Sequence, residues 1–399
     1  MAEEIPVEVI ADILSRLPVT SLLRFRSISK SWRSLIDSKH FMKLHLNNSL
    51  TNPNPNLTNL ILRHNTDLYR ADFPSIGAAV NLNHPLMCYS NRINILGSCH
   101  GLLCICNVAD DIAFWNPSLR KHRLLPYLPT RRTPEPENTI FAARVYGFGF
   151  DPFAADYKLV RISYFVNLHD RTFDSQVRLY SSRTNAWKAL PSMPYALCCA
   201  RTMGVFVHHA LHWVVTRKLQ PDQPDLIIAF DLSLESFSEM PLPETGYGDG
   251  DDDGEFEIEV ALFEGCLCMI VNYHSTRVDV WVMKEYGLKE SWCKLFSLME
   301  SPDLRSLKCL RPLGYSVDGV KILLEHNRKK LCWYDLRSKQ VSHVRIPGMP
   351  NLNEGMICVG SLVPPSLPVE NCRRQRKLGC ENARKTRDDF LSQGFKLTL

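Results

Sequence analysis

Residues 5–36 have the sequence IPVEVIADILSRLPVTSLLRFRSISKSWRSLI, which predicts a small module of short helices. Pro6 suits the first position of a helix, where its missing N–H costs no hydrogen bond. Apolar residues then recur at helical spacing until Pro18 ends the pattern: Ile10, Ile13, Leu14 and Leu17. Two further short helices are expected around residues 22–25 and 32–36. A module of about forty residues cannot bury this much apolar surface alone, so the helices either pack on the rest of the chain or present a docking surface.

The chain beyond the module, up to about residue 363, has the texture of an all-β domain. Short β-rich runs alternate with Pro, Gly, Asn and Asp clusters. An apolar run, a polar turn and a second aromatic or apolar run recur with a period of roughly 45–55 residues, which suits four-stranded propeller blades. Five copies begin at Ile112, Val177, Ile227, Val278 and Leu331.

A sixth blade is expected from both ends of this region. The strands near 58–90 and the run 355–363 can share one sheet, and this would close the ring and remove an exposed sheet edge. We therefore expect about six blades, with a distorted or partly open ring as the alternative.

Composition limits the possible functions. The net charge of +5 falls mostly on residues 370–399, which hold eight Lys/Arg against four Asp/Glu. No basic face for nucleic acid is therefore expected outside this tail. The N-terminus lacks the pattern of a signal peptide, and no run of eighteen apolar residues predicts a membrane span.

The fourteen cysteines lie mainly in apolar, strand-like runs, and no C-x-x-C occurs. Free cysteine packs as a small hydrophobic residue, so reduced core thiols are predicted. Reduced thiols are typical of proteins in the cytoplasm and nucleus.

Several residue clusters that could suggest chemistry are better explained otherwise. His208, His209 and His212 lie in a strand-like run that should point the first two to opposite sides, so no metal site is expected. The acidic stretch 249–259 lacks the order of an EF-hand, and a mobile acidic loop is favoured over calcium binding. No nucleophile elbow or phosphate-binding loop occurs. We therefore predict no catalytic residue and no cofactor.

The N-terminal module resembles the F-box, most closely its plant version. The matching residues are Ile5-Pro6, Ile13-Leu14, Leu17-Pro18, Leu22-Leu23-Arg24-Phe25 and Ser29–Ile36. The resemblance implies binding to a Skp-type adaptor and, through it, to a cullin–RING ubiquitin ligase. The adaptor-binding residues that it implies are Ile5, Pro6, Ile10, Ile13, Leu14, Leu17, Pro18, Leu22, Phe25 and Trp32.

The β-rich region resembles the F-box-associated domain, which is sometimes described as kelch-type. The matching motifs are Gly97–Cys104, Trp115–Ser118, Tyr146–Pro152, Ala229–Leu232 and Trp281–Gly287. The double glycine of true kelch repeats is missing, so the kelch description fits less closely. In this family the domain is taken to hold the protein that is ubiquitinated. The apolar ending 388–399 resembles a subgroup that restrains plant immunity by promoting turnover of nucleotide-binding leucine-rich-repeat receptors.

The expected organisation is an F-box at 1–46, a linker at 47–57, a propeller at 58–363 and a basic, partly flexible tail at 364–399. The tail is either a nuclear-import signal or a solvated end. We expect a non-catalytic substrate receptor of a ubiquitin ligase, in the cytoplasm and nucleus. The alternatives are a propeller scaffold that works without a ligase and a propeller that binds glycans or acts as an enzyme.

Overall fold

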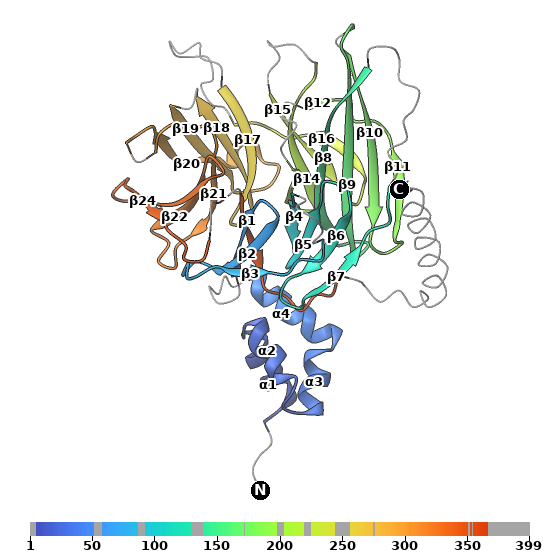
Figure 1. Cartoon of the computed structure of the whole chain (residues 1–399), viewed down its shortest axis with the longest axis vertical. Coiled ribbons are helices and arrows are strands. Elements are labelled where there is room, and N and C mark those ends of the chain that lie inside the picture. Colours follow the sequence, from blue (N-terminus) through green and yellow to red (C-terminus); the bar gives the residue numbers. More distant parts are fainter. Residues whose placement is uncertain are drawn as a thin grey trace, which may run out of the picture. The chain divides into compact units, whose positions relative to one another are not determined.

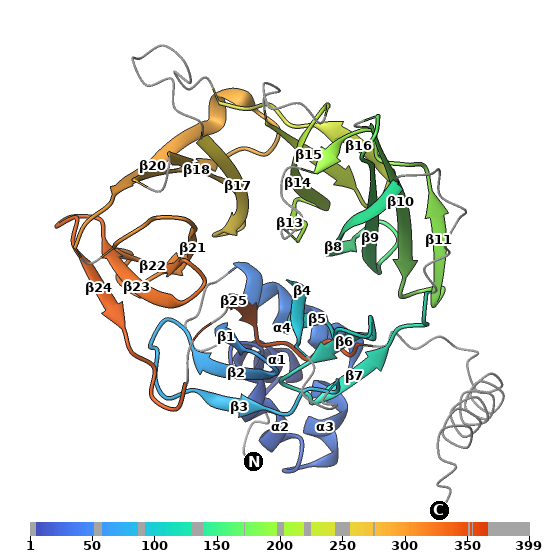
Figure 2. The same cartoon turned by 45° about the horizontal axis from the view of Figure 1, so that its top comes forward.

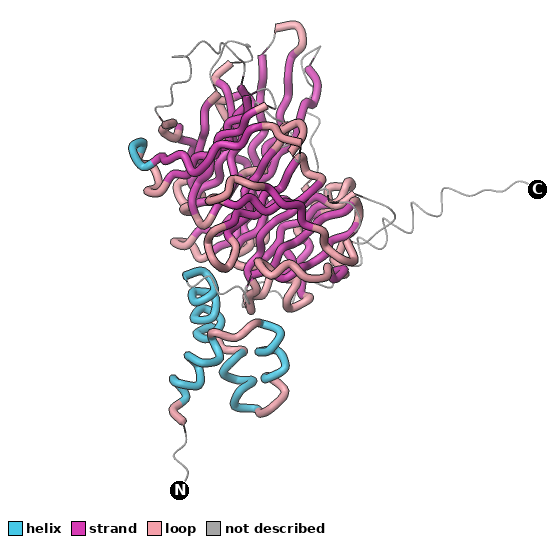
Figure 3. Tube along the Cα trace, turned by 90° about the vertical axis from the view of Figure 1, so that its left-hand side faces the viewer, coloured by secondary structure: helices cyan, strands magenta, loops and turns pink. Residues whose placement is uncertain are grey.

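Four helices precede six small antiparallel sheets in the computed structural model of the chain (Figure 1). The structure describes residues 5–51, 58–86, 92–128, 139–170, 172–197, 203–218, 225–243, 256–273, 276–302, 304–349, 352 and 354–365. The expected fold class, an α-helical N-terminal module followed by a propeller of six blades, is confirmed. Helices are almost confined to the N-terminal module, and strands make up most of the remainder (Figure 3).

The helical module contains α1 (Val7–Ser15), α2 (Val19–Phe25), α3 (Lys30–Ile36) and α4 (Lys39–Thr51). Pro6 and Pro18 are the N-cap residues of α1 and α2, so Pro6 lies one position before the helix in which it was expected. Ser29 caps α3 by accepting a hydrogen bond from Trp32 N at 3.1 Å. The centre of the module holds Leu14, Val19, Leu22, Ile36 and Phe41.

Helix α4 differs from the expectation, which placed a linker from residue 47. The helix continues to Thr51 although its last turns are polar. Ser49 Oγ donates to His45 O and Thr51 Oγ1 donates to Asn47 O, both at 2.8 Å. Such bonds to the helix's own backbone do not stabilise a helix by themselves. The last turns are held by packing, because Phe41, His45 and Ser49 are buried along one face of α4. Residues 52–57 lie outside the described part of the chain.

Blades one to three are formed by β1–β11 together with β25. Blade one contains β25 (Glu354–Val359), β1 (Thr58–His64), β2 (Asp67–Asp72) and β3 (Val80–Leu82). Blade two contains β4 (Asn94–Cys99), β5 (Leu102–Cys106), β6 (Ile112–Asn116) and β7 (Lys121–Leu124). Blade three contains β8 (Thr139–Asp151), β9 (Asp156–Asn167), β10 (Thr172–Ser181) and β11 (Ala186–Leu190).

The other three blades complete the ring (Figure 2). Blade four contains β12 (Ala196–Leu197), β13 (Val205–Val207), β14 (Ala210–Thr216), β15 (Leu226–Asp231) and β16 (Ser236–Glu239). Blade five contains β17 (Phe256–Phe263), β18 (Cys266–Tyr273), β19 (Arg277–Met283), a 3-10 turn (Lys289–Ser291) and β20 (Trp292–Met299). Blade six contains β21 (Leu310–Tyr315), β22 (Lys321–His326), β23 (Lys330–Asp335) and β24 (Val341–Val344).

The ring closes where the two ends of the β domain share one sheet. Strand β25 pairs antiparallel with β1, and Cys358 lies opposite Asn59 while Glu354 lies opposite Arg63. This sheet, blade one, is the blade that the sequence predicted from the two ends of the β region. The five repeated units are confirmed as the outer hairpins of the other blades, from β6–β7 to β23–β24.

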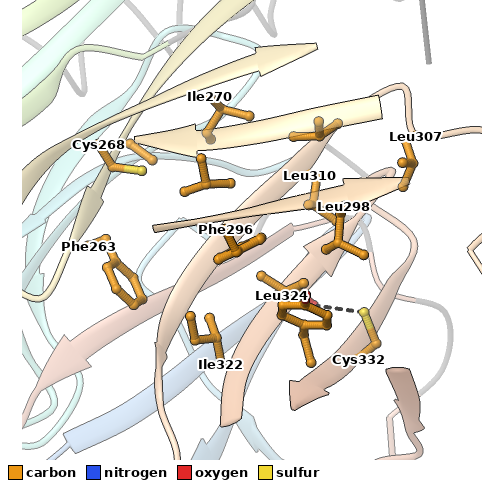
Figure 4. Close-up of a cluster of buried hydrophobic side chains, with 14 of the residues drawn as sticks. Phe263, Cys268, Ile270, Phe296, Leu298, Leu307, Leu310, Ile322, Leu324 and Cys332 are labelled. Atoms are coloured by element: carbon orange, nitrogen blue, oxygen red, sulfur yellow. Dashed lines mark hydrogen bonds between the residues drawn. The ribbon is translucent and has the colours of Figure 1, made fainter. Parts of the chain in front are cut away.

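Apolar clusters fill the space between neighbouring blades. Figure 4 shows the cluster between blades five and six, where Phe263 and Phe296 face Ile322 and Leu324. Cys332 lies in the same cluster, and its thiol contacts Leu324 O at 3.9 Å. Comparable clusters lie at each of the other five junctions. The largest share of the hydrophobic stabilisation therefore comes from contacts between blades.

Two local expectations were wrong. His208 and His209 form the turn between β13 and β14 with φ of 46° and 71°, so they do not alternate along a strand. Glu257 and Glu259 belong to β17 and not to a loop. Residues 244–255 and 366–399, with the rest of the acidic stretch and nearly all of the tail, lie outside the described residues. Within the described ranges, no helix is long and apolar enough to cross a membrane.

Candidate functional site

The helical module exposes apolar side chains around α1. Ile5, Val7 and Ile13 are 61%, 59% and 54% exposed, and Val9 and Ile28 are exposed as well. Pro6 is also exposed. Apolar side chains that are concentrated on one small module are typical of an interaction surface. The sequence motifs did not single out Val7, Val9 and Ile28, although their apolar character on the first helix and the α2–α3 turn was a visible signal.

The other residues that the resemblance implied are less accessible. Ile10, Leu17, Pro18, Phe25 and Trp32 are half-buried. The rings of Phe25 and Trp32 meet edge to face at 5.5 Å. Leu14 and Leu22 are buried in the centre of the module, at 2% and 0% exposure. They hold the helices together, so in this arrangement a partner reaches Ile5, Pro6 and Ile13 and not these two leucines.

Helix α4 fixes the turn between α1 and α2. The Nε2–H of buried His45 donates to Leu17 O at 3.0 Å, and Asn48 Nδ2 donates to Ser15 Oγ at 2.6 Å. Burial lowers the pKa of His45, although the bond to Leu17 opposes this shift. Helix α4 thus holds the residues just before Pro18, although the F-box-like motif quoted from the sequence ends at Ile36, before this helix begins.

A second candidate site is the channel along the axis of the propeller. Its cavity has a volume of about 690 Å³, within the range of ligand-binding pockets. The innermost strands β25, β4, β8, β13, β17 and β21 line it. Its charged lining residues are Arg63, Arg92, Arg144, Arg311, Arg328, Lys329, Glu259, Glu325 and Glu354. No local motif could have revealed this set, because its members are spread over almost three hundred residues.

Buried ion pairs stiffen the channel wall where blades six and one meet. Arg63 Nε donates to Glu354 Oε2 at 3.0 Å, and Arg311 Nη2 donates to Glu325 Oε2 at 2.8 Å. Gly355 N donates to the same Glu325 oxygen at 2.6 Å, and Arg311 also donates to Gly355 O. Burial lowers the pKa of Arg311, but Glu325 and Glu354 outweigh it and raise that pKa overall. These charges are therefore held in fixed positions around the closing strand.

Two motifs of the β domain have structural roles at junctions. Asn116 Nδ2 donates to Ser361 O at 3.0 Å and to Val363 O at 2.8 Å, which ties blade two to the segment after β25. Tyr146 OH donates to Asp110 Oδ1. Arg144 and Arg161 each donate to Asp110 Oδ2 at 2.9 Å.

Eight of the nine described cysteines have a raised pKa, because burial disfavours their thiolate form. All nine cysteines in the described ranges are free, and burial raises the pKa of Cys332 to about 12 and of Cys358 to about 11. A thiol with a raised pKa is a poor nucleophile at neutral pH. His212 lies between Val205 O at 3.0 Å and Tyr286 OH at 2.8 Å. Among the described residues, no group of three or more His, Cys, Asp or Glu side chains could hold a metal ion.

Comparisons with known protein families agree with both parts of this arrangement. Residues 3–44 match the F-box domain, and residues 58–358 match the F-box associated beta propeller domain. The chain belongs to the F-box proteins with an F-box-associated propeller. F-box proteins of this kind are generally substrate adaptors.

The chain aligns with known relatives over most of the length of both proteins. The chain is 34% identical to F-box protein CPR1 of Arabidopsis thaliana, over 99% of each chain. It is 27% identical to F-box/kelch-repeat protein At3g23880 of the same plant, over 91% of this chain and 96% of that protein. Among solved structures, an oligogalacturonate lyase in complex with manganese aligns with 9% identity and a TM-score of 0.38, over 70% of each chain. This likeness is too low to support an argument about function.

Proposed function

We propose that this F-box protein is the substrate-recognition subunit of a Skp–cullin–F-box ubiquitin ligase. The exposed apolar surface of Ile5, Val7 and Ile13, on a module that matches the F-box, carries the proposal. This surface docks on a Skp-type adaptor, and the propeller binds the protein to be ubiquitinated. The chain then acts by proximity, because holding a target beside the ligase replaces a second-order encounter by an intramolecular one.

Adaptor binding is tested with Ile13→Asp in the full chain. Ile13 is 54% exposed, so the new carboxylate is solvated in the free protein but loses its water at the interface. We expect adaptor affinity to fall at least about tenfold, with an unchanged melting temperature. Binding is measured by calorimetric titration with the purified adaptor.

Leu168→Asp is the matched control, because it places the same charge at an exposed leucine of the propeller, 62% exposed. It should bind the adaptor as the natural chain does. Equal adaptor affinity of the Ile13→Asp and natural chains would contradict the proposed docking surface. If the natural chain binds no adaptor at all, the proposal of a ligase subunit fails.

We further propose that the degraded targets include immune receptors of the nucleotide-binding leucine-rich-repeat class. The support is the resemblance of the ending 388–399 to the immune-restraining subgroup and the similarity to F-box protein CPR1. The chain then works in the cytoplasm and nucleus, with the basic residues of 370–399 as a candidate nuclear-import signal. Deleting 388–399 should slow receptor turnover in cells and leave adaptor binding intact. Unchanged receptor levels with either chain would exclude this target class.

A further inference from the structure

The charges of the propeller channel gather at one end of it. Arg328 and Lys329 lie in the β22–β23 turn, Arg92 lies just before β4, and Arg63 lies near the end of β1. The helical module connects to the opposite end of β1, at Thr58. The helical module is therefore joined to the ring at one end of the channel, and the charged side chains lie at the other end.

The charged end carries more positive than negative groups. Six arginine or lysine side chains line the cavity against three glutamates. Arg63 and Arg311 are already paired with Glu354 and Glu325, and Arg144 is paired with Asp110. Burial lowers the pKa of the Arg328 guanidinium, but neighbouring groups that include the third glutamate, Glu259, raise that pKa overall. Arg92, Arg328 and Lys329 are exposed at the mouth. The positive excess thus lies where a ligand would enter.

The paired arginines also keep unused donors in the wall. Among the described residues, Arg63 Nη1 and Arg311 Nε have no hydrogen-bond partner, and Arg63 is only 5% exposed. Buried donors of this kind are rarely left unsatisfied in proteins. The guanidinium geometry suits oxyanions such as carboxylate and phosphate.

We propose that the mouth of the channel beside the β22–β23 turn binds an acidic segment of a target polypeptide through its oxyanions. The oxyanions sit against Arg92, Arg328 and Lys329, at the rim of a cavity whose glutamates can accept peptide N–H groups. This mixture favours a polypeptide over a nucleic acid, because a polypeptide backbone supplies N–H donors for the glutamates and a sugar–phosphate backbone has none. The inference rests on the proposed function for the identity of the ligand as a degradation target.

The experiment uses the full chain and short fluorescein-labelled peptides in which glycine alternates with glutamate, phosphoserine or glutamine. The first variant, Arg328→Gln with Lys329→Gln, removes two charges at the mouth. The matched control, Arg337→Gln with Lys339→Gln, removes two exposed charges from the turn at the other end of the same blade. Arg328 and Lys339 both have positive φ, of 54° and 59°. Each double variant therefore changes one residue with a left-handed backbone, so the two variants are matched in backbone strain as well as in charge.

We expect the glutamate or the phosphoserine peptide to bind the natural chain, and the ratio of their affinities identifies the preferred oxyanion. The first variant should weaken binding at least about tenfold, and the control should not. Higher salt should weaken binding of the natural chain more than binding of the first variant. The inference is overturned if the acidic peptides bind no better than the glutamine peptide, or if both variants weaken binding equally.

Adaptor binding is measured on the same preparations. A chain that binds the adaptor but no acidic peptide contradicts this inference alone. A chain that binds the acidic peptide at the mouth but no adaptor contradicts the proposed ligase function and leaves the peptide site standing.

Discussion

Single charged residues fasten one blade of the propeller to the next. Lys158 Nζ donates to Asp151 Oδ2 at 2.9 Å and to Leu232 O at 2.5 Å, and it lies 3.3 Å from Glu235 Oε1. Burial would raise the pKa of Asp151, but Lys158 and Ser233 hold it below its usual value. The pair therefore connects β8 and β9 of blade three with the β15–β16 turn of blade four.

Replacing Lys158 by methionine should destabilise the protein by about 3–5 kcal/mol, because it leaves the Asp151 carboxylate buried without a counter-ion. Urea unfolding measures the loss. Lys158→Met combined with Asp151→Asn removes both charges and should regain part of the stability. A double variant as unstable as the single one would show that the methionine packs poorly and that charge is not the cause.

Two histidines, the buried His212 and the half-buried His100, should make stability depend on pH. Burial lowers the pKa of His212 to about 4, and burial with a smaller effect of His209 lowers that of His100 to about 4. An unfolded histidine titrates near about 6.5, so between these values the unfolded state takes up protons that the native state does not. The free energy of unfolding should fall as pH decreases from about 6.5 to 4, by up to about 1.4 kcal/mol per pH unit for each histidine.

The contribution of His212 is isolated by comparing His212→Gln with His122→Gln, a change at an exposed histidine of β7. Urea unfolding across the pH range should show a shallower slope for the first variant only. If both variants keep the slope of the natural chain, groups other than His212 determine the acid sensitivity.

Among the secondary-structure elements, the innermost strands depend on close backbone approach. A Cβ at Gly149 of β8 would lie 2.3 Å from Phe206 Cδ2, and one at Gly147 would lie 2.8 Å from Leu211 Cδ1. This explains why the Tyr146–Pro152 motif alternates glycine with aromatic residues: the aromatic side chains fill one junction, and the glycines admit the side chains of blade four.

Gly149→Ala should therefore destabilise the propeller by about 1–3 kcal/mol, the usual range for overpacking. Gly77→Ala is the control, because its nearest neighbouring atom would lie at 3.9 Å and its φ is not positive. The control should change the free energy of unfolding by less than about 0.5 kcal/mol. Equal losses in thermal denaturation would indicate that the close packing at β8 relaxes freely.

The sequence predicted some elements well because their signals were local. The outer hairpins β6–β7 and β10–β11 combine apolar runs with polar turns, and this pattern recurs in the other blades. Helix α4 was missed because two of the residues on its buried face, His45 and Ser49, are polar, so the face gives little apolar periodicity. The spacing of Ile13 and Leu14 placed both on one face, but a module that is apolar on two sides gives no signal for which side is buried.

For the whole molecule, stability should depend on the closing strand. β25 supplies the partner of β1, carries the Glu354 that pairs with Arg63, and leads to the segment that Asn116 holds. The ring closure could be predicted because the two terminal strand signals each lacked a partner. The charged channel could not, because Arg63, Arg311 and Glu354 meet only when the ring is closed.

Two truncated chains test this dependence. A chain that ends at Pro365 keeps β25 and the Asn116 contacts, so it should unfold in one calorimetric transition at the melting temperature of the full chain.

A chain that ends before Glu354 leaves the edge of β1 unpaired and Arg63 buried without its counter-ion, each of which is costly. It should melt at a markedly lower temperature, or aggregate through the open edge. If both chains melt like the full protein, the remaining five junctions suffice for stability and the closing strand serves only to shape the channel.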